Sequence, residues 1–322
     1  MSAGLAAWLA LSVAVAALFA LDLVLFRRTG EIPFARAAAW SALYTVLGLA
    51  FGALLWAWQG PGPAEEYLAG FLIEKSLSVD NVFVFALIFA YFAVPAASQG
   101  RVLFWGIAGA LLLRAVFIAA GAALLDAVHA TVYVFGALLL ATAVRIARHT
   151  EVEVHPERNP ALRLLRRLLP VTGYRDDRFL VREGGRLAAT PLAAALVLVA
   201  SFDVVFAVDS IPAIFAVTRD PFIVFAANAF SLLGLAPLYF LLAGMMHRFH
   251  YLNLGLGVIL AFVGAKMLLS DLVKIPVYVS LAVIVAVLGL AVGASLLRPR
   301  TPAERAGRAE APAPARSGGG DP

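Results

Sequence analysis

The sequence predicts an all-α polytopic membrane protein, a bundle of about nine transmembrane helices arranged like an inverted-repeat transporter. Its 322 residues are 62% hydrophobic and only 14% charged, whereas a soluble domain carries about 25% charged residues. Nine stretches are long and apolar enough to cross a bilayer, which takes about 20 residues. Of the 25 Lys and Arg residues, 20 fall in alternate connections or in the C-terminal tail, a bias typical of cytoplasmic segments.

The predicted spans follow from the apolar runs taken in order. They cover residues 5–26, 37–57, 66–92, 102–125, 129–148, 188–209, 221–245, 251–269 and 277–297. The fifth run is the shortest and follows the fourth after only a few residues. The first run has no basic segment before it and is full span length, so we expect a retained helix rather than a cleaved signal peptide.

The basic residues also predict the orientation of the chain. The outer connections hold only Arg219 and Lys274, and Lys75, Arg114 and Lys266 lie within predicted spans. The other 20 share one side, which the positive-inside rule assigns to the cytoplasm. The N-terminus is therefore predicted outside and the C-terminus inside, in the cytoplasmic (inner) membrane of a bacterium. The net charge of +5 then belongs to the membrane side, and no nucleic-acid partner is expected.

Two regions differ in composition, a transmembrane domain at 1–298 and a tail at 299–322. The tail is rich in Pro, Ala and Gly and has little to bury, so we expect it to be disordered in the cytoplasm. The sequence contains no cysteine. Disulfides, thiolate metal sites and thiol redox chemistry are therefore excluded for this chain.

One basic cytoplasmic loop, 149–187, is the only sizeable predicted connection. Within it, ALRLLRRLL (161–169) predicts a short helix that lies on the anionic inner leaflet. FLVREGGRL (179–187) predicts a small hairpin that turns at Gly184-Gly185. We interpret the loop as a positive-inside linker, with a regulatory or partner-binding loop as the alternative.

Two of the predicted spans carry acidic residues at membrane depth. The third holds Glu74 and Asp80, and the sixth holds Asp203 and Asp209. A charge at the centre of a bilayer costs roughly 3 kcal/mol or more, so it persists where it is paired, hydrated or bound to a ligand. These two segments are therefore the candidate functional site.

The two acidic segments resemble each other. A shift of 129 residues places VDNV (79–82) on VDSI (208–211) and Glu74 on Asp203. A shift of 123 residues also gives matches, so the register stays open. The third span is predicted to run inward and the sixth outward. Related segments that run in opposite directions are typical of inverted-repeat transporters.

Helical geometry separates the four acids into two directions. Residues seven apart share a face, so Glu74 aligns with Asn81, and Asp203 aligns with Ser210. Residues six apart point roughly 120° away from each other on an ideal helix, which separates each second acid from the first. The four acids can therefore meet only if a helix breaks, for which Pro212 is the candidate, or if they enter the site from two sides.

The donors in these segments favour a hard divalent cation such as Mn²⁺, Mg²⁺ or Ca²⁺, because all of them are oxygens. The predicted metal ligands are Glu74, Asp80, Asn81, Asp203, Asp209 and Ser210, with supporting positions at Ser76, Ser78, Lys75, Arg114, Lys266 and Asn228. Alternatives are a self-contained Glu74–Lys75 ion pair, acids that satisfy polar contacts between helices, and Arg114 and Lys266 as neutralising partners.

The segments EKSLSVDNVFVF (74–85) and FAVDSIPAIFAVTRDPFIVFAAN (206–228) make the chain similar to the TerC family. These are tellurium-resistance-associated integral membrane proteins whose better-studied members export manganese. The similarity extends over nearly the whole body, including RVLFWGIAGALLLR (101–114). The resemblance implies that the motif acids of the family correspond to Glu74, Asp80, Asp203 and Asp209, and its amide and hydroxyl to Asn81 and Ser210.

The chain departs from the family pattern at three positions. Ala200 stands where the family commonly has a glutamate, Phe202 where it has a serine, and Ala236 where it has an arginine. The loss of one acid and one base together suggests that a charge pair was removed as a unit.

The expected function is export of divalent cations, with Mn²⁺ as substrate, by alternating access between the halves that carry the third and sixth spans. No permanently bound cofactor is expected, and protons are the candidate coupling ion because the sequence has no GxxxxGK loop for ATP. An enzyme is not expected, since no catalytic histidine motif lies in a span. The alternative is a membrane scaffold that moves no ions and supports tellurite resistance or the metallation of exported proteins.

Overall fold

The structure, a computed structural model, describes residues 4–26, 33–148, 156–174, 178–183, 185–243, 251–273 and 275–297. Its helices are α1 (Leu5–Phe26), α2 (Phe34–Gln59), α3 (Pro61–Tyr91), α4 (Ala96–Ala127), α5 (Thr131–Arg148), α6 (Pro160–Leu168), α7 (Pro191–Phe215), α8 (Pro221–Leu233), α9 (Leu235–Ala243), α10 (Leu252–Leu268) and α11 (Val277–Leu297), with a 3-10 turn at Pro156–Arg158. Among these residues the strands β1 (Leu180–Glu183) and β2 (Arg186–Ala189) form the one sheet. The predicted all-α class is confirmed.

Each predicted span coincides with a helix or a helix pair. Within the described part of the chain, six helices are long and apolar enough to cross a membrane: α1, α2, α4, α5, α7 and α11. The pair α8 and α9, bent by 42°, would make a seventh. Helix α10 is shorter, and α3 has 31 residues but carries several charges. The count of nine spans and their orientation stay predictions.

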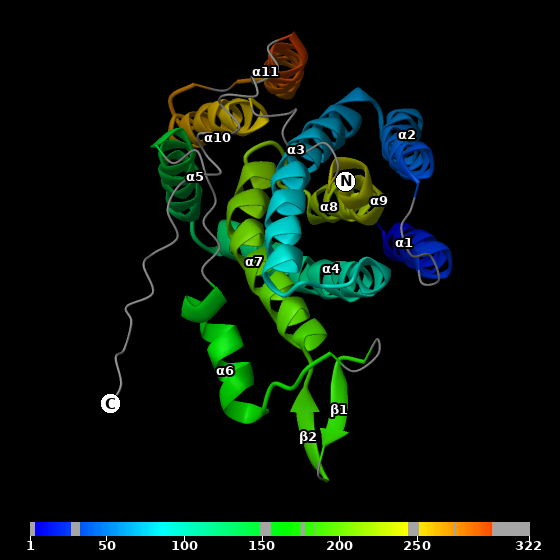
Figure 1. Cartoon of the computed structure of the whole chain (residues 1–322). Helices are drawn as coiled ribbons and strands as arrows, with labels where there is room; N and C mark the ends of the chain where they lie inside the picture. The colour runs from blue at the N-terminus through cyan, green and yellow to red at the C-terminus, as the bar shows by residue number, and fades with distance from the viewer. Residues whose placement is uncertain are drawn as a thin grey trace.

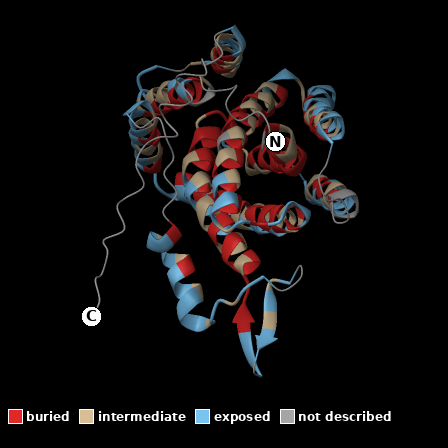
Figure 2. Cartoon of the chain, in the orientation of Figure 1, coloured by how far each residue is buried: buried red, intermediate tan, exposed pale blue. Residues whose placement is uncertain are grey.

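Helices α3 and α7 form the centre of the bundle (Figure 1). Helices α4, α8 and α9 pack around them, α1 and α2 lie at one edge, and α5, α10 and α11 lie at the opposite edge. Burial follows this plan: buried residues concentrate in α3, α7 and α8, whereas the outer helices show exposed faces (Figure 2). Those faces include large apolar side chains such as Leu112 and Leu290, as expected for helices that face lipid.

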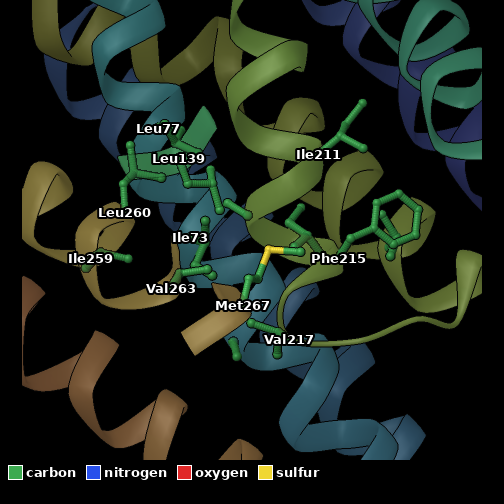
Figure 3. Close-up of a cluster of buried hydrophobic side chains, with 14 of the residues drawn as sticks. Ile73, Leu77, Leu139, Ile211, Phe215, Val217, Ile259, Leu260, Val263 and Met267 are labelled. Atoms are coloured by element: carbon green, nitrogen blue, oxygen red, sulfur yellow. The ribbon is translucent and has the colours of Figure 1, made fainter. Parts of the chain in front are cut away.

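A cluster of aliphatic side chains packs α3 and α7 against α5 and α10 (Figure 3). Ile73 and Leu77 of α3 meet Ile211 and Phe215 of α7 and the buried side chains of α10. These residues precede and follow the acidic positions along the same helices. The polar site therefore lies in a protein interior rather than at a lipid-facing surface.

The two halves of the predicted repeat contact each other through glycines. A Cβ on Gly136 of α5 would lie 3.0 Å from Gly264 O, and a Cβ on Gly264 of α10 would lie 2.9 Å from Gly136 O. Only glycine allows backbones to approach this closely. The two positions are 128 residues apart, within one residue of the larger repeat offset. Mutual contact of equivalent positions is expected for elements related by a two-fold axis, so it favours this register over the shift of 123.

The described parts of the central loop contain both predicted elements. Helix α6 begins after Asn159, whose side chain accepts from the backbone N–H groups of Ala161 and Leu162. The two strands of the hairpin pair antiparallel with Glu183 opposite Arg186, as a turn at the predicted position requires. The tail at 299–322 lies outside the described residues, so its predicted disorder stays a prediction.

Candidate functional site

A buried arginine joins four helices at the centre of the bundle. Arg114 of α4 is 1% exposed. Its Nη1 donates to Glu74 Oε1 on α3 and, at 2.6 Å, to Asn228 Oδ1 on α8. Nη1 also lies 3.2 Å from Ser210 Oγ, and Nη2 lies 3.4 Å from Asp203 Oδ1, both on α7. Two acids of the predicted repeat, Glu74 and Asp203, therefore meet at one guanidinium.

Glycines hold α4 close to α7 on both sides of Arg114. A Cβ at Gly106 would lie 2.8 Å from a methyl of Val199, and a Cβ at Gly121 would lie 2.9 Å from the ring of Phe215. The two contacts advance along both helices in the same direction, so α4 and α7 run parallel. This packing fixes the backbone from which the guanidinium extends.

Asn228 reaches the guanidinium because its amide is oriented by its own helix. Its Nδ2 donates to Val224 O at 2.8 Å, which turns Oδ1 toward Arg114. Nearby on α8, Ser231 Oγ lies 3.3 Å from Ser78 Oγ of α3. Asn228 is a predicted supporting residue, and the structure brings it into direct contact with the charged cluster.

Several polar atoms of this cluster have no hydrogen-bond partner among the described residues. They include one oxygen of each acid, Glu74 Oε2 and Asp203 Oδ2, and Oδ1 and Nδ2 of Asn81. All three side chains are buried, and Asn81 is 1% exposed. Leaving a buried polar atom without a partner costs about 1–3 kcal/mol. Such atoms in one region are therefore typical of a site that receives a ligand.

The packing of α3 on α7 places Asn81 at the level of Asp203. A Cβ at Gly70 would meet Ile214, and four residues further along α3 Glu74 shares Arg114 Nη1 with Ser210, four residues earlier in α7. The two helices therefore run antiparallel. Continued in the same register, this pairing brings Asn81 opposite Asp203, so the atoms without partners come from adjoining turns of facing helices.

Asp209 lies apart from this cluster, on the side of α7 that faces α5. Its Oδ1 accepts from Thr142 Oγ1 at 2.8 Å, and its Oδ2 accepts from Arg145 Nη2 at 3.2 Å. The three side chains line an open cavity of about 390 Å³ together with apolar residues of both helices. Its separation from Asp203 agrees with the roughly 120° expected for residues six apart.

The four predicted acids therefore do not converge in the part of the chain that the structure describes. Glu74 and Asp203 meet, Asp209 faces another helix, and the side chain of Asp80 lies outside the described part. Within the described residues, no group of three or more His, Cys, Asp or Glu side chains is placed to hold a metal ion. A single four-carboxylate centre is not what the described residues form.

The helix break expected at Pro212 is wrong. Helix α7 continues through Pro212 and ends at Phe215. The proline lies in the last turn, where only a few backbone groups follow it, so the loss of its hydrogen bond disturbs little of the helix. The acids are thus separated by the regular geometry of one continuous helix.

The intramembrane lysines do not share the acidic cluster in the structure. The self-contained Glu74–Lys75 pair is wrong, because Glu74 pairs with Arg114. Lys75 Nζ has no hydrogen-bond partner among the described residues and lies beside Gly234 and Tyr44. Lys266 Nζ donates to Ser280 Oγ at 2.9 Å. The interpretation of Arg114 as a neutralising partner agrees with its ion pairs.

Sequence reasoning missed the partners of Asp209. Thr142 is an ordinary polar residue in an apolar span, and Arg145 counted only as a basic residue at the inner end of a predicted helix. Their only signal is that they lie three residues apart and thus share a helix face. Ser76 is buried without a hydrogen-bond partner among the described residues, so a role for it stays a prediction.

Comparisons with known proteins cover nearly the whole body of the chain. The model of the family described as "Integral membrane protein TerC family" matches residues 60–303. "Uncharacterized membrane protein STKORF319" of Myxococcus xanthus is 48% identical over 295 residues, which cover 91% of this chain and 92% of that protein. "Putative membrane-bound redox modulator Alx" of Escherichia coli (strain K12) is 47% identical over 292 residues, covering 87% and 91%. No solved structure matches the chain.

Proposed function

Because the chain belongs to the TerC family of integral membrane proteins, we propose that it is a transporter that exports divalent cations, with Mn²⁺ as its main substrate. One observation carries the proposal: two buried carboxylates, Glu74 and Asp203, each keep one oxygen without a partner. The amide oxygen of Asn81 adds a neutral donor of the same kind. Oxygen donors with negative charge inside a membrane protein suit a cation that must be stripped of water.

The choice of Mn²⁺ among hard cations follows from dehydration. Mg²⁺ gives up its water reluctantly and usually keeps several water molecules in protein sites. A buried site that offers carboxylate and amide oxygens therefore favours an ion that exchanges water more easily. The absence of cysteine from the sequence and the lack of sulfur or imidazole in the described cluster favour Mn²⁺ over softer ions.

Asp209 is proposed as a second station for the same ion. It faces the cavity between α5 and α7, whereas Glu74 and Asp203 face the interior between α3, α4 and α7. An ion would pass from one side of α7 to the other as the halves α3–α5 and α7–α10 change their relative position. Such movement is the alternating access expected of inverted repeats, with protons as the candidate coupling ion that replaces the metal on the carboxylates.

Binding of Mn²⁺ to the purified protein tests the proposed site. We expect Asp203→Asn to raise Kd about 30-fold, since removal of one charged interaction at a buried site costs about 2 kcal/mol. Asp209→Asn, which faces the open cavity, is expected to raise Kd about fivefold, or about 1 kcal/mol. Isothermal titration calorimetry would measure both, with Asp126→Asn at the exposed end of α4 as the control. Equal affinity in wild type and Asp203→Asn would contradict the site.

The name of the Escherichia coli relative refers to redox modulation, and this bears on the alternative of a scaffold. Thiol chemistry is not available to a chain without cysteine. Control of the level of a redox-active metal ion would account for such a name through transport alone. A scaffold would instead act through a surface that contacts other proteins, for which α6 is the candidate because Arg163, Arg166 and Arg167 are exposed.

Replacement of the three arginines of α6 by glutamine separates the two functions. We expect the triple variant to keep at least half of the wild-type Mn²⁺ export, because exposed charges contribute about 0–1 kcal/mol each and Leu162, which packs α6 on the body, is unchanged. Export from cells expressing either protein would be measured at equal membrane levels. Complete loss of activity with normal Mn²⁺ binding would favour the scaffold.

A further inference from the structure

We propose that Arg114 is a tethered counter-cation that competes with the transported ion. Its guanidinium pairs with Glu74 and Asp203 in the metal-free carrier and leaves at least one of them when a divalent cation binds. This inference rests on the proposed function and concerns the regulation of the same site. It assigns to a basic residue of α4 a direct effect on the affinity for the ion.

The contact geometry of Arg114 is that of a replaceable cation. Nη1 binds Glu74 and Nη2 faces Asp203, so each acid is held through one oxygen only. A structural arginine pair is frequently bidentate, with two parallel hydrogen bonds to one carboxylate. Here Nε has no partner among the described residues. The guanidinium bridges the two acids and leaves one oxygen on each available to an arriving ion.

Neutral acceptors are placed to receive the guanidinium when it leaves an acid. Asn228 Oδ1 lies 2.6 Å from Nη1, and Ser210 Oγ lies 3.2 Å from the same atom. Nη1 has two hydrogens but faces three acceptors, including Glu74, so it cannot bond all of them well at once. The loss of the bond to Glu74 therefore leaves the guanidinium hydrogen-bonded.

The charges of the described groups make the two cations exclude each other. Glu74, Asp203 and Arg114 together carry one negative charge when all three are ionised. A divalent ion added beside the guanidinium would leave one positive charge in a buried site, whereas the two carboxylates alone would neutralise it. Repulsion between like charges is strong where the surroundings are apolar. Binding of the ion therefore favours the state in which the guanidinium has moved away.

The counter-cation explains how the carrier could return without its substrate. Two buried carboxylates without a partner would be strongly destabilising. Glycine contacts hold α4 against α7 before and after Arg114, so the guanidinium remains within reach when the metal departs. The protein then pays for this balance with weaker binding, since every ion must displace an internal competitor.

Affinity for Mn²⁺ in purified full-length protein in lipid nanodiscs tests the inference. We expect Arg114→Gln to bind Mn²⁺ about tenfold more tightly than wild type, within the usual range of coupling between two sites. Arg114→Lys, whose single ammonium reaches fewer acceptors, should have an intermediate Kd and decides the question if Arg114→Gln cannot be purified. Lys266→Gln removes an intramembrane positive charge that bonds to Ser280 instead, and we expect its Kd to match the wild type.

The outcomes separate the counter-cation from the proposed function. A structural arginine would make binding weaker when replaced, so unchanged or weaker binding by the Arg114 variants, with tight binding by the wild type, overturns the inference alone. Tighter binding by Lys266→Gln to the same extent would reduce the effect to a general field and also overturns it. Failure of wild type and all variants to bind Mn²⁺ overturns the cation site and the inference together.

Discussion

Export of Mn²⁺ falls to the background level when Glu74 and Asp203 are neutralised together. The two acids come from facing helices and share one guanidinium, and each supplies one oxygen that has no partner among the described residues. Loss of about 2 kcal/mol for each charged ligand amounts to about 4 kcal/mol, or roughly 1,000-fold in affinity. The double variant Glu74→Gln/Asp203→Asn keeps the shape of both side chains, so the change is mainly one of charge.

Cellular manganese measured by mass spectrometry would give this result. The host strain should lack its own exporters, so that accumulation reports on this protein. The matched control is Glu65→Gln/Asp126→Asn, which neutralises two acids near the ends of α3 and α4 and leaves the pairs with Arg114 in place. Wild-type export by the Glu74→Gln/Asp203→Asn variant, present in the membrane at normal levels, would contradict the assignment of these acids.

The free energy of unfolding falls by about 3–5 kcal/mol in Arg114→Gln, the usual cost of removing one partner of a buried ion pair. The guanidinium contacts two carboxylates, an amide and a hydroxyl from three helices. Its removal leaves Glu74 and Asp203 charged and unpaired in the interior. The added Glu74→Gln change removes one of those charges, so the double variant should be more stable than Arg114→Gln by about 1–2 kcal/mol.

Unfolding in mixed micelles without divalent ions would measure these values for wild type, both single variants and the double variant. The coupling between the two positions is the quantity of interest, because it does not depend on how either side chain packs alone. Lys266→Gln again serves as the control for loss of an intramembrane cation. Additive effects of the two substitutions would show that the ion pair contributes nothing to the fold.

Much of the fold follows from the sequence because lipid imposes strong rules on it. An apolar run of span length forms a helix, and every predicted span coincides with one or with the bent pair α8 and α9. The repeat is also visible in the sequence, since VDNV and VDSI lie 129 residues apart. Contact between Gly136 and Gly264 then chose between the two registers. Sequence similarity alone could not do so, because it says nothing about which positions touch.

Half of the site could be predicted in the same way. The seven-residue spacing placed Glu74 with Asn81 and Asp203 with Ser210, and the six-residue spacing directed Asp209 elsewhere. What the spacing could not give is the partner on another helix. Arg114 lies 40 residues from Glu74 and 89 from Asp203, and no local pattern on α4 marks it as their shared partner. Thr142 and Arg145 are equally distant from Asp209 in sequence.

Pro212 shows the limit of reasoning from residue type. A proline in a membrane span suggests a break that could expose backbone carbonyls to an ion. The structure places it in the final turn of α7, where a missing hydrogen bond has little effect. The position of a helix end is set by packing of the last turn, and the sequence leaves that end uncertain by several residues.

Flux of Mn²⁺ through the purified protein in proteoliposomes tests the central claim most directly. A fluorescent reporter of Mn²⁺ inside the vesicles would record entry of the ion, with protein-free vesicles and vesicles carrying the Glu74→Gln/Asp203→Asn variant as controls. The account predicts saturable uptake by the wild type and background rates in both controls. Well-folded wild-type protein that moves no divalent ion, with or without a pH gradient, would contradict it and would leave the paired acids a purely structural role.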